Sequence, residues 1–273
     1  VAFHQHVVGA CAVQEKHHGA KALELAETAQ CLAPERARLV LVGFGAIAGA
    51  VARMLAERRA PVDLVGVGLR QSSRPGLPQG VPVLREPAEL ATTRADLVVE
   101  AAGRDAVAPW GRAALPAGVD FAVSSTSAFA GTELLAELTT LARTSGAKLI
   151  IPPGALGGMD ALSAAQRMGL TSVTHRIVKP PRAWAGTGAE DLCDLGALTT
   201  ASAFFRGSAN EASARFPQNA NAALITALAG LGPEETQVVL IADPATTTNR
   251  HEISAEGAFG RMALSFENAA LPD

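Results

Sequence analysis

The sequence has few charged residues and no long apolar run. Charged residues make up 18% of the 273 residues, and the formal net charge is -3. Nucleic acids and anionic membranes are bound through concentrated basic patches, so this charge gives no case for either partner. No apolar run reaches the ~18 residues that a membrane span needs. The sequence therefore predicts neither a nucleic-acid-binding protein nor a membrane protein.

Cysteine is also scarce. Cys11, Cys31 and Cys193 are odd in number and widely spaced, which excludes a disulfide framework and a zinc knuckle. The first residues lack the basic segment that opens a signal peptide. These features predict a cytoplasmic protein.

Apolar residues make up 48% of the chain, and this length suggests about two domains. Residues 1–37 precede the first expected strand and form an N-terminal extension, with a short amphipathic helix expected at 21–32. This extension holds four histidines: His4, His6, His17 and His18. No Cys or carboxylate cluster completes a ligand set there, so no metal site is expected.

A strand, a glycine turn and a helix follow one another without a spacer after this extension. Residues 39–42 are a continuous apolar run, typical of a strand buried on both faces. Gly43 and Gly45 interrupt the run, and a helical pattern begins at Ala46 and Ile47. The N-H groups and positive dipole end of such a helix bind pyrophosphate. These four residues are therefore candidate dinucleotide contacts, and the alternative is a plain βα turn.

The second expected strand, residues 62–69, bears on the choice of cofactor. Many NAD enzymes end this strand with an acidic residue that binds the ribose hydroxyls. Here no carboxylate is present, and Arg70 and Arg74 follow instead. Arginines at this position favour a ribose 2'-phosphate, unless they are ordinary loop charges. We therefore expect NAD or NADP as cofactor, with NADP used at least comparably to NAD.

Strands and helices alternate up to residue 152. Further strands are expected at 81–84, 95–100, 119–123 and 147–151, and helices near 87–91, 105–115 and 133–143. This alternation predicts an α/β fold, in which residues 38–152 form a Rossmann domain with a doubly wound parallel sheet. The small residues 101–103 leave room for a ligand at the sheet edge.

A proline-rich break at 152–154 separates a second part with a different rhythm. Strands are expected at 172–178, 201–206, 237–242, 250–255 and 260–266, with helices at 158–168, 209–215 and 221–231. Strands that follow one another at short range imply an antiparallel or mixed sheet. Residues 153–273 are thus expected to be an α+β substrate domain. Its apolar strands also predict a sheet-mediated homodimer.

Four separate segments of this second part together resemble the L-aspartate dehydrogenase family. They are residues 153–165, residues 179–187 with Lys179, residues 216–221 with Asn221, and residues 241–251 with His251. The glycine turn and residues 99–103 agree in place and order, so the resemblance covers about residues 38–273. The family usually continues past residue 273 into a final helix, which this sequence is expected to lack.

The resemblance implies an NAD(P)-dependent enzyme that oxidatively deaminates L-aspartate through iminoaspartate to oxaloacetate and ammonia, or runs the reverse reaction. It places the catalytic histidine on His251 and cofactor contacts on Ala155 and Asn221. Two alternatives stay open. One is another two-domain NAD(P) oxidoreductase acting on a different amino or oxo acid, and the other is a dinucleotide-binding sensor without catalysis.

The residue chemistry is compatible with these roles. His251 can accept a proton near neutral pH, unless it is a satisfied strand histidine. Lys179 and Arg182 are candidate carboxylate anchors, unless they belong to a solvated basic turn. Asn219 and Asn221 either cap a helix or turn an amide toward the site, with Asn219 and Lys179 as the candidate substrate-binding residues.

Overall fold

The computed structural model describes residues 36–71, 75–131, 133–217 and 220–269. The expected N-terminal helix, the four histidines of the extension, Arg74 and Asn219 lie outside these residues. None of the helices that the structure describes combines the length and apolar character that crossing a membrane requires.

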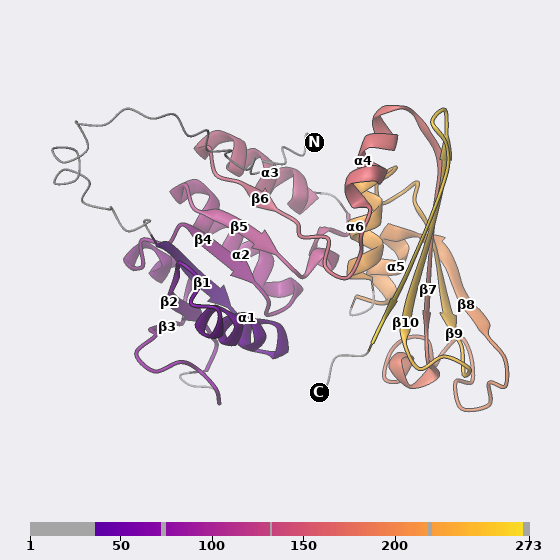
Figure 1. Cartoon of the computed structure of the whole chain (residues 1–273), viewed down its shortest axis with the longest axis horizontal. Helices are drawn as coiled ribbons and strands as arrows, with labels where there is room; N and C mark the ends of the chain where they lie inside the picture. The colour runs from indigo at the N-terminus through magenta and orange to yellow at the C-terminus, as the bar shows by residue number, and fades with distance from the viewer. Residues whose placement is uncertain (1–35, 72–74, 132, 218–219, 270–273) are drawn as a thin grey trace, which may run out of the picture. The chain divides into compact units, whose positions relative to one another are not determined.

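The first part of the chain forms a six-stranded parallel sheet with the order β3-β2-β1-β4-β5-β6 (Figure 1). Its strands are β1 (Ala37–Val42), β2 (Val62–Gly68), β3 (Val83–Leu84), β4 (Leu97–Glu100), β5 (Asp120–Val123) and β6 (Leu149–Ile150). The expected Rossmann sheet is confirmed. The order reverses at β1, so the carboxyl ends of β1 and β4 flank the crevice in which such sheets bind ligands.

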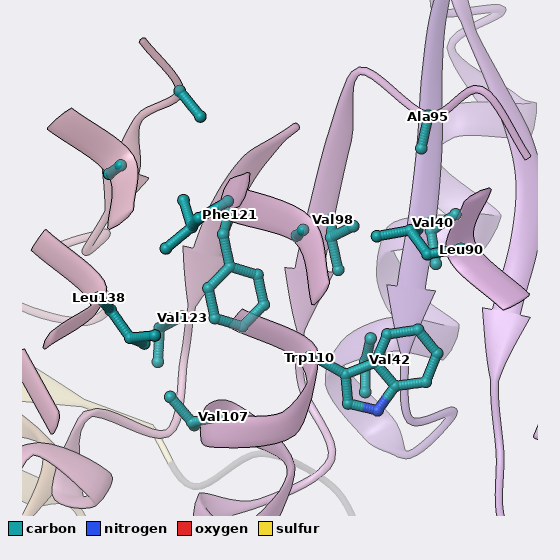
Figure 2. Packing of buried hydrophobic residues seen from close by; sticks show 14 of the residues in the cluster. Val40, Val42, Leu90, Ala95, Val98, Val107, Trp110, Phe121, Val123 and Leu138 are labelled. Carbon is teal, nitrogen blue, oxygen red and sulfur yellow. The ribbon is translucent and has the colours of Figure 1, made fainter. Parts of the chain in front are cut away.

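Strand β1 shows why this sheet carries helices on both faces. Leu39 and Leu41 belong to one buried cluster, and Val40 and Val42 belong to another. Successive side chains of a strand point to opposite faces, so a continuous apolar run needs a cover on each side. Figure 2 shows the second cluster, to which Val40 and Val42 contribute together with Leu90 and Trp110.

The connections are mostly helical, as expected. They are α1 (Ala46–Glu57), η1 (Pro87–Thr92), α2 (Arg104–Ala114), η2 (Leu115–Ala117), η3 (Thr126–Phe129) and α3 (Glu133–Ser145). The helix expected near 87–91 is a 3-10 helix. Glu86 and Glu89 form a reciprocal capping box there, which stabilises this short turn without a full α-helix.

The second part forms a five-stranded sheet with the order β11-β10-β7-β9-β8. Its strands are β7 (Leu170–Lys179), β8 (Ser202–Ser208), β9 (Gln237–Ala242), β10 (Asn249–Gly257) and β11 (Gly260–Asn268). Strands β7 and β9 are parallel and the other pairs are antiparallel, so the sheet is mixed. Its helices are α4 (Met159–Arg167), η4 (Pro181–Trp184), α5 (Ala209–Arg215) and α6 (Asn221–Ala229).

Helix α6 connects the two sheets through hydrogen bonds at its first residue. The Asn221 side-chain oxygen accepts from the Ser127 N-H at 2.9 Å, and the Asn221 carbonyl accepts from the Thr126 hydroxyl at 2.9 Å. Both partners lie in η3, directly after β5. The start of α6 is thereby fixed against the carboxyl edge of the parallel sheet.

Candidate active site

A cavity of about 840 Å³ lies at the carboxyl ends of β1, β2 and β4. It is lined by the glycine turn at 42–45, by residues 68–71 and 101–106, by Ser125 and Ser127, and by Pro217 and Asn221. This is the edge at which the sequence predicted a dinucleotide.

The glycine turn has the geometry that a phosphate group needs. Gly43 has a φ of +85°, and a Cβ there would lie 2.6 Å from the Ala102 Cα, so only glycine fits between β1 and the loop after β4. A Cβ on Gly45 would meet nothing within 4 Å, which leaves its backbone open to a ligand. Gly45 is also the N-cap of α1. The pyrophosphate of NAD(P) therefore fits this turn, with the helix dipole directed at it.

Three other predicted cofactor contacts lie outside the lining of this cavity. Ala46 and Ile47 are exposed at the start of α1. Ala155 is exposed in the turn that precedes α4. The contacts of these residues with the cofactor stay predictions.

Glu100, at the end of β4, bonds to the two loops that line one side of the cavity. Its carboxylate is fully buried, with 0% relative exposure, and accepts four hydrogen bonds. The donors are the N-H groups of Ala102 and Gly103 at 2.8 Å and the N-H and hydroxyl of Ser125 at 3.0 Å. Burial of a carboxylate without hydrogen-bond donors costs free energy, so the fold favours keeping these donors in place. Because the donors belong to the loops after β4 and β5, Glu100 holds the two loops together at the cavity.

Arg70, Arg85 and Arg104 line the cavity, with Asp105 as the carboxylate among its lining residues. Arg70 directly follows Leu69, as the sequence indicated, and Arg85 follows β3. The Arg85 guanidinium donates to the Arg70 carbonyl at 2.5 Å, which brings the two residues together. Arg85 was not predicted as a site residue, although its position after a strand of the parallel sheet is a usable signal.

Asn221 is the first residue of α6 and not its cap, which is Ala220. The capping alternative is therefore wrong for Asn221. Because its side-chain oxygen accepts from the Ser127 N-H, its amide NH2 group remains for a ligand in the cavity.

His251 lies on β10, and the register of the strands sets its neighbours. It pairs with Ile177 on β7. His175 and Lys179 are two residues before and after Ile177, so both are diagonal neighbours of His251 on the same face of the sheet. The His251 Nδ1 lies 3.0 Å from the His175 Nε2. The imidazole of His251 is buried, with 7% relative exposure.

Burial sets the charge state of these groups. It lowers the pKa of His251 to about 4, with a further lowering from the positive charge of Lys179. Burial and the neighbouring His251 lower the pKa of His175 to about 3. Both rings are therefore neutral at pH 7. Burial also lowers the pKa of Lys179 to about 8, so Lys179 stays mostly protonated at neutral pH.

Lys179 is positioned at the end of β7 by an aromatic neighbour. Its ammonium lies 5.2 Å from the centre of the Trp184 ring, a cation-π contact that favours the charged form. Trp184 itself is fixed through its indole N-H, which donates to the Ile241 carbonyl at 3.1 Å. Arg182, the other predicted anchor, is exposed in η4.

His251 and Lys179 are not among the residues that line the cavity, but α6 connects the two places. Asn221, the first residue of α6, lines the cavity. The Thr226 hydroxyl in the same helix lies 2.9 Å from the His175 Nδ1. The sequence reasoning missed His175 and Thr226. A signal for His175 was present, because it takes the buried position between the apolar Val173 and Ile177, on the same side of the alternating strand.

A Rossmann sheet with a glycine turn at its switch point, joined to a mixed sheet that carries a buried histidine and a lysine, is the arrangement of an NAD(P)-dependent oxidoreductase. Two family profiles match the chain. "Homoserine dehydrogenase, NAD binding domain" matches residues 43–152, and "Aspartate dehydrogenase, C-terminal" matches residues 160–273.

Individual relatives point to one family. The chain is 57% identical to an L-aspartate dehydrogenase of Brucella anthropi over 85% of this chain and 88% of the relative. It is 40% identical to an L-aspartate dehydrogenase of Ruegeria pomeroyi over 87% of this chain and 86% of the relative. The solved structure of aspartate dehydrogenase from Thermotoga maritima superposes with a TM-score of 0.69 at 28% identity, covering 85% of this chain and 89% of that one. The chain belongs to the L-aspartate dehydrogenase family.

Proposed function

We propose that this protein oxidises L-aspartate to iminoaspartate, which is hydrolysed to oxaloacetate and ammonia, or runs this reaction in reverse. The buried His251 beside Lys179 is the observation that carries this proposal. A substrate with two carboxylates needs a cation to bind it, and hydrolysis of the imine formed from it needs a neutral base. These two groups are diagonal neighbours on one face of the second sheet.

In this proposal the dinucleotide lies along the 840 Å³ cavity and supplies a hydride acceptor at the substrate α-carbon. Gly45 would offer its backbone N-H to the pyrophosphate, and Gly43, whose own N-H donates to the Gly68 carbonyl at 2.8 Å, would hold the tight turn that lets the phosphates approach. The Asn221 amide, which Ser127 orients, donates to the carboxamide end. Further contacts with the dinucleotide are proposed for three exposed residues outside the cavity lining: Ala46, Ile47 and Ala155.

Lys179 is proposed to bind a substrate carboxylate, with Asn219 as a second polar contact. A charged ammonium that is already partly desolvated binds an anion more strongly than an exposed one. The bound carboxylate also adds negative charge close to His251, which opposes the effect of Lys179 and raises the pKa of His251 from about 4 toward neutrality. Substrate binding would thus make His251 a better base.

His251 is proposed to accept a proton from the water that adds to the imine carbon. The water oxygen forms a bond to this carbon, and its proton passes to the His251 Nε2, since Nδ1 is engaged with His175. The imidazolium then returns a proton to the amine nitrogen; as the carbon-nitrogen bond breaks and ammonia leaves, the hydroxyl on the same carbon becomes the carbonyl and releases its proton, the one that the protonated imine carried, to solvent. The ring ends each cycle neutral, so the proton balance is closed.

The arginines of the cavity support use of NADP as well as NAD. Arg70 and Arg85 lie together after β2 and β3, where the adenosine ribose is bound in Rossmann folds. The end of β2 carries no carboxylate, and a carboxylate at this place would repel a 2'-phosphate. We therefore propose that NADP is used at least comparably to NAD.

The domain roles and the assembly belong to the same proposal. Residues 38–152 would bind the dinucleotide, and residues 153–273 would bind the substrate and form a homodimer through the second sheet. Sedimentation showing only monomer at micromolar concentration would rule out the dimer. A small-molecule substrate and a cytoplasmic location fit this reading of the family.

Replacement of His251 tests the proposed mechanism. His251→Ala should lower kcat by about 10² to 10⁴, which general base catalysis typically contributes. The affinity for the dinucleotide should stay nearly unchanged, because Gly43, Gly45 and Asn221 remain. A variant with near-normal kcat removes His251 from the mechanism, and one that loses only dinucleotide affinity assigns it to the cofactor site instead.

A further inference from the structure

Thr226, His175 and His251 form a continuous chain of hydrogen-bonding groups. The Thr226 hydroxyl lies 2.9 Å from the His175 Nδ1, and the His175 Nε2 lies 3.0 Å from the His251 Nδ1. Thr226 and His175 have 0% relative exposure. The chain connects α6, β7 and β10 and ends at the side chain proposed to exchange protons with the substrate.

The proton positions along this chain are coupled. A neutral imidazole has one N-H donor and one acceptor nitrogen, so each ring can donate in only one direction. In one arrangement the His251 Nδ1-H donates to the His175 Nε2, and the His175 Nδ1-H donates to the Thr226 oxygen. In the reverse arrangement the hydroxyl donates to His175, and the proton of His251 lies on Nε2. Only the first arrangement leaves the His251 Nε2 free to accept a proton.

The protonated state of His251 selects the first arrangement. Both nitrogens of an imidazolium are donors, so His175 must then accept at its Nε2 and carry its own proton on Nδ1. That Nδ1-H has the Thr226 oxygen as its acceptor. A chain already arranged in this way needs no reorganisation when His251 takes up a proton, which is the condition for efficient catalysis in a buried site.

We propose that His175, held by the Thr226 hydroxyl, is a positioning residue that keeps the proton of neutral His251 on Nδ1 and leaves Nε2 as the acceptor for the substrate. This inference rests on the proposed role of His251. His175 itself touches neither substrate nor cofactor in this scheme.

None of the charged groups that the structure describes around His175 and His251 is placed to accept a hydrogen bond from the His251 Nδ1-H. Lys179 on β7 is a positively charged neighbour of His251, and it carries no acceptor for a ring N-H. Helix α6 and strand β9 have no titratable residues, and β11 places Phe266 opposite His251. Arg250 and Glu252 flank His251 on β10 and bond to each other, with Glu252 also bonded to Arg176, so they belong to the other face of the sheet. His175 is therefore the acceptor available to the His251 Nδ1-H among the described residues.

A pair of conservative replacements at Thr226 tests the inference in the full chain. Thr226→Val has nearly the same shape but no hydroxyl, whereas Thr226→Ser keeps the hydroxyl. Loss of one buried hydrogen bond corresponds to about 1 to 1.5 kcal/mol, so Thr226→Val should lower kcat by about tenfold with little change in KM for the dinucleotide. Thr226→Ser should retain most of the activity. Equal activity of the Val and Ser variants would overturn the proposal.

Two further measurements separate positioning from a general packing defect. In a His251→Ala background, Thr226→Val should have no additional effect on kcat, because residues that act through one group are not additive. A further tenfold loss there would show a structural effect only. At His175 itself, Gln has an oxygen at about the place of Nε2, so His175→Gln should retain more activity than His175→Leu.

Histidine ¹⁵N NMR gives a readout that does not depend on turnover. In the wild-type chain at pH 7, the resonance that disappears in His251→Ala should show a protonated Nδ1, and Thr226→Val should shift it toward a mixture of tautomers. A wild-type His251 protonated on Nε2 would overturn the inference. If His251→Ala does not lower kcat, the proposed function of His251 fails; if it does and Thr226→Val does not, the inference alone fails.

Discussion

Lowering the pH from about 7.5 to about 4.5 should destabilise this fold by about 5 kcal/mol through two buried histidines. In the unfolded chain both rings have a pKa near 6.5 and take up protons below it. In the folded chain burial lowers the pKa of His175 to about 3 and that of His251 to about 4. The unfolded state therefore binds more protons than the folded state between these values. Stability is retained above pH 6.5 and falls as the pH falls toward 4.

The magnitude follows from these values. One pKa unit corresponds to about 1.4 kcal/mol, and pH 4.5 lies about two units below the unfolded pKa of about 6.5 while both folded rings stay mostly neutral. Each ring thus contributes about 2.5 kcal/mol. A domain is commonly stable by only about 5 to 15 kcal/mol, so the change is large enough to measure.

Urea unfolding followed by far-UV circular dichroism at both pH values measures this difference. His175→Gln removes one titrating ring, so its loss of stability between the two pH values should be smaller than that of the wild type by about 2.5 kcal/mol. Ile177→Val is the matched control, because it lowers stability by about 1 kcal/mol at both pH values alike. If His175→Gln and the wild type lose equal stability, the ring of His175 is not held neutral by the fold.

Three further outcomes follow from the site. Gly43→Ala should raise Kd for the dinucleotide by at least tenfold in fluorescence titration and lower Tm, because its Cβ would lie 2.6 Å from the Ala102 Cα at a φ of +85°. Lys179→Met should raise KM for aspartate by about 10- to 100-fold through loss of one charge-assisted hydrogen bond. The wild-type KM for aspartate should rise above pH 8, because the Lys179 ammonium deprotonates there. A KM that does not change with pH in this range would exclude Lys179 as the carboxylate-binding residue. Arg85→Ala should reduce kcat/KM for NADP about tenfold more than that for NAD, whereas equal losses would separate Arg70 and Arg85 from the 2'-phosphate.

Local patterns in the sequence were sufficient for most of the fold. The apolar run at 39–42, the following glycines and the switch to helical spacing are short-range signals, and the structure confirms the parallel sheet that they predict. The mixed sheet of the second part was likewise predicted from strands spaced at short range. The helix expected near Pro87 is present as a 3-10 helix, and the sequence pattern did not specify which kind of helix forms there.

The site was harder to predict because its contacts join residues far apart in the chain. His251 was identified through its surrounding motif, but its partner His175 is 76 positions away. Only the register between β7 and β10 brings them together, and no short-range pattern fixes that register. Arg85 was missed for a similar reason, since its place in the cavity depends on β3 pairing with β2.

Substrate-dependent reduction of NAD and NADP over a panel of amino acids tests the central claim most directly. The purified chain should turn over L-aspartate and produce oxaloacetate and ammonia in equal amounts. Other amino acids, including glutamate, asparagine and homoserine, should give less than about one hundredth of that rate, because a missing or displaced carboxylate removes or misplaces the charge-assisted contact that Lys179 is proposed to make with the substrate. Preferential turnover of a different amino acid, or binding of NAD(P) with no turnover of any, would contradict the assignment.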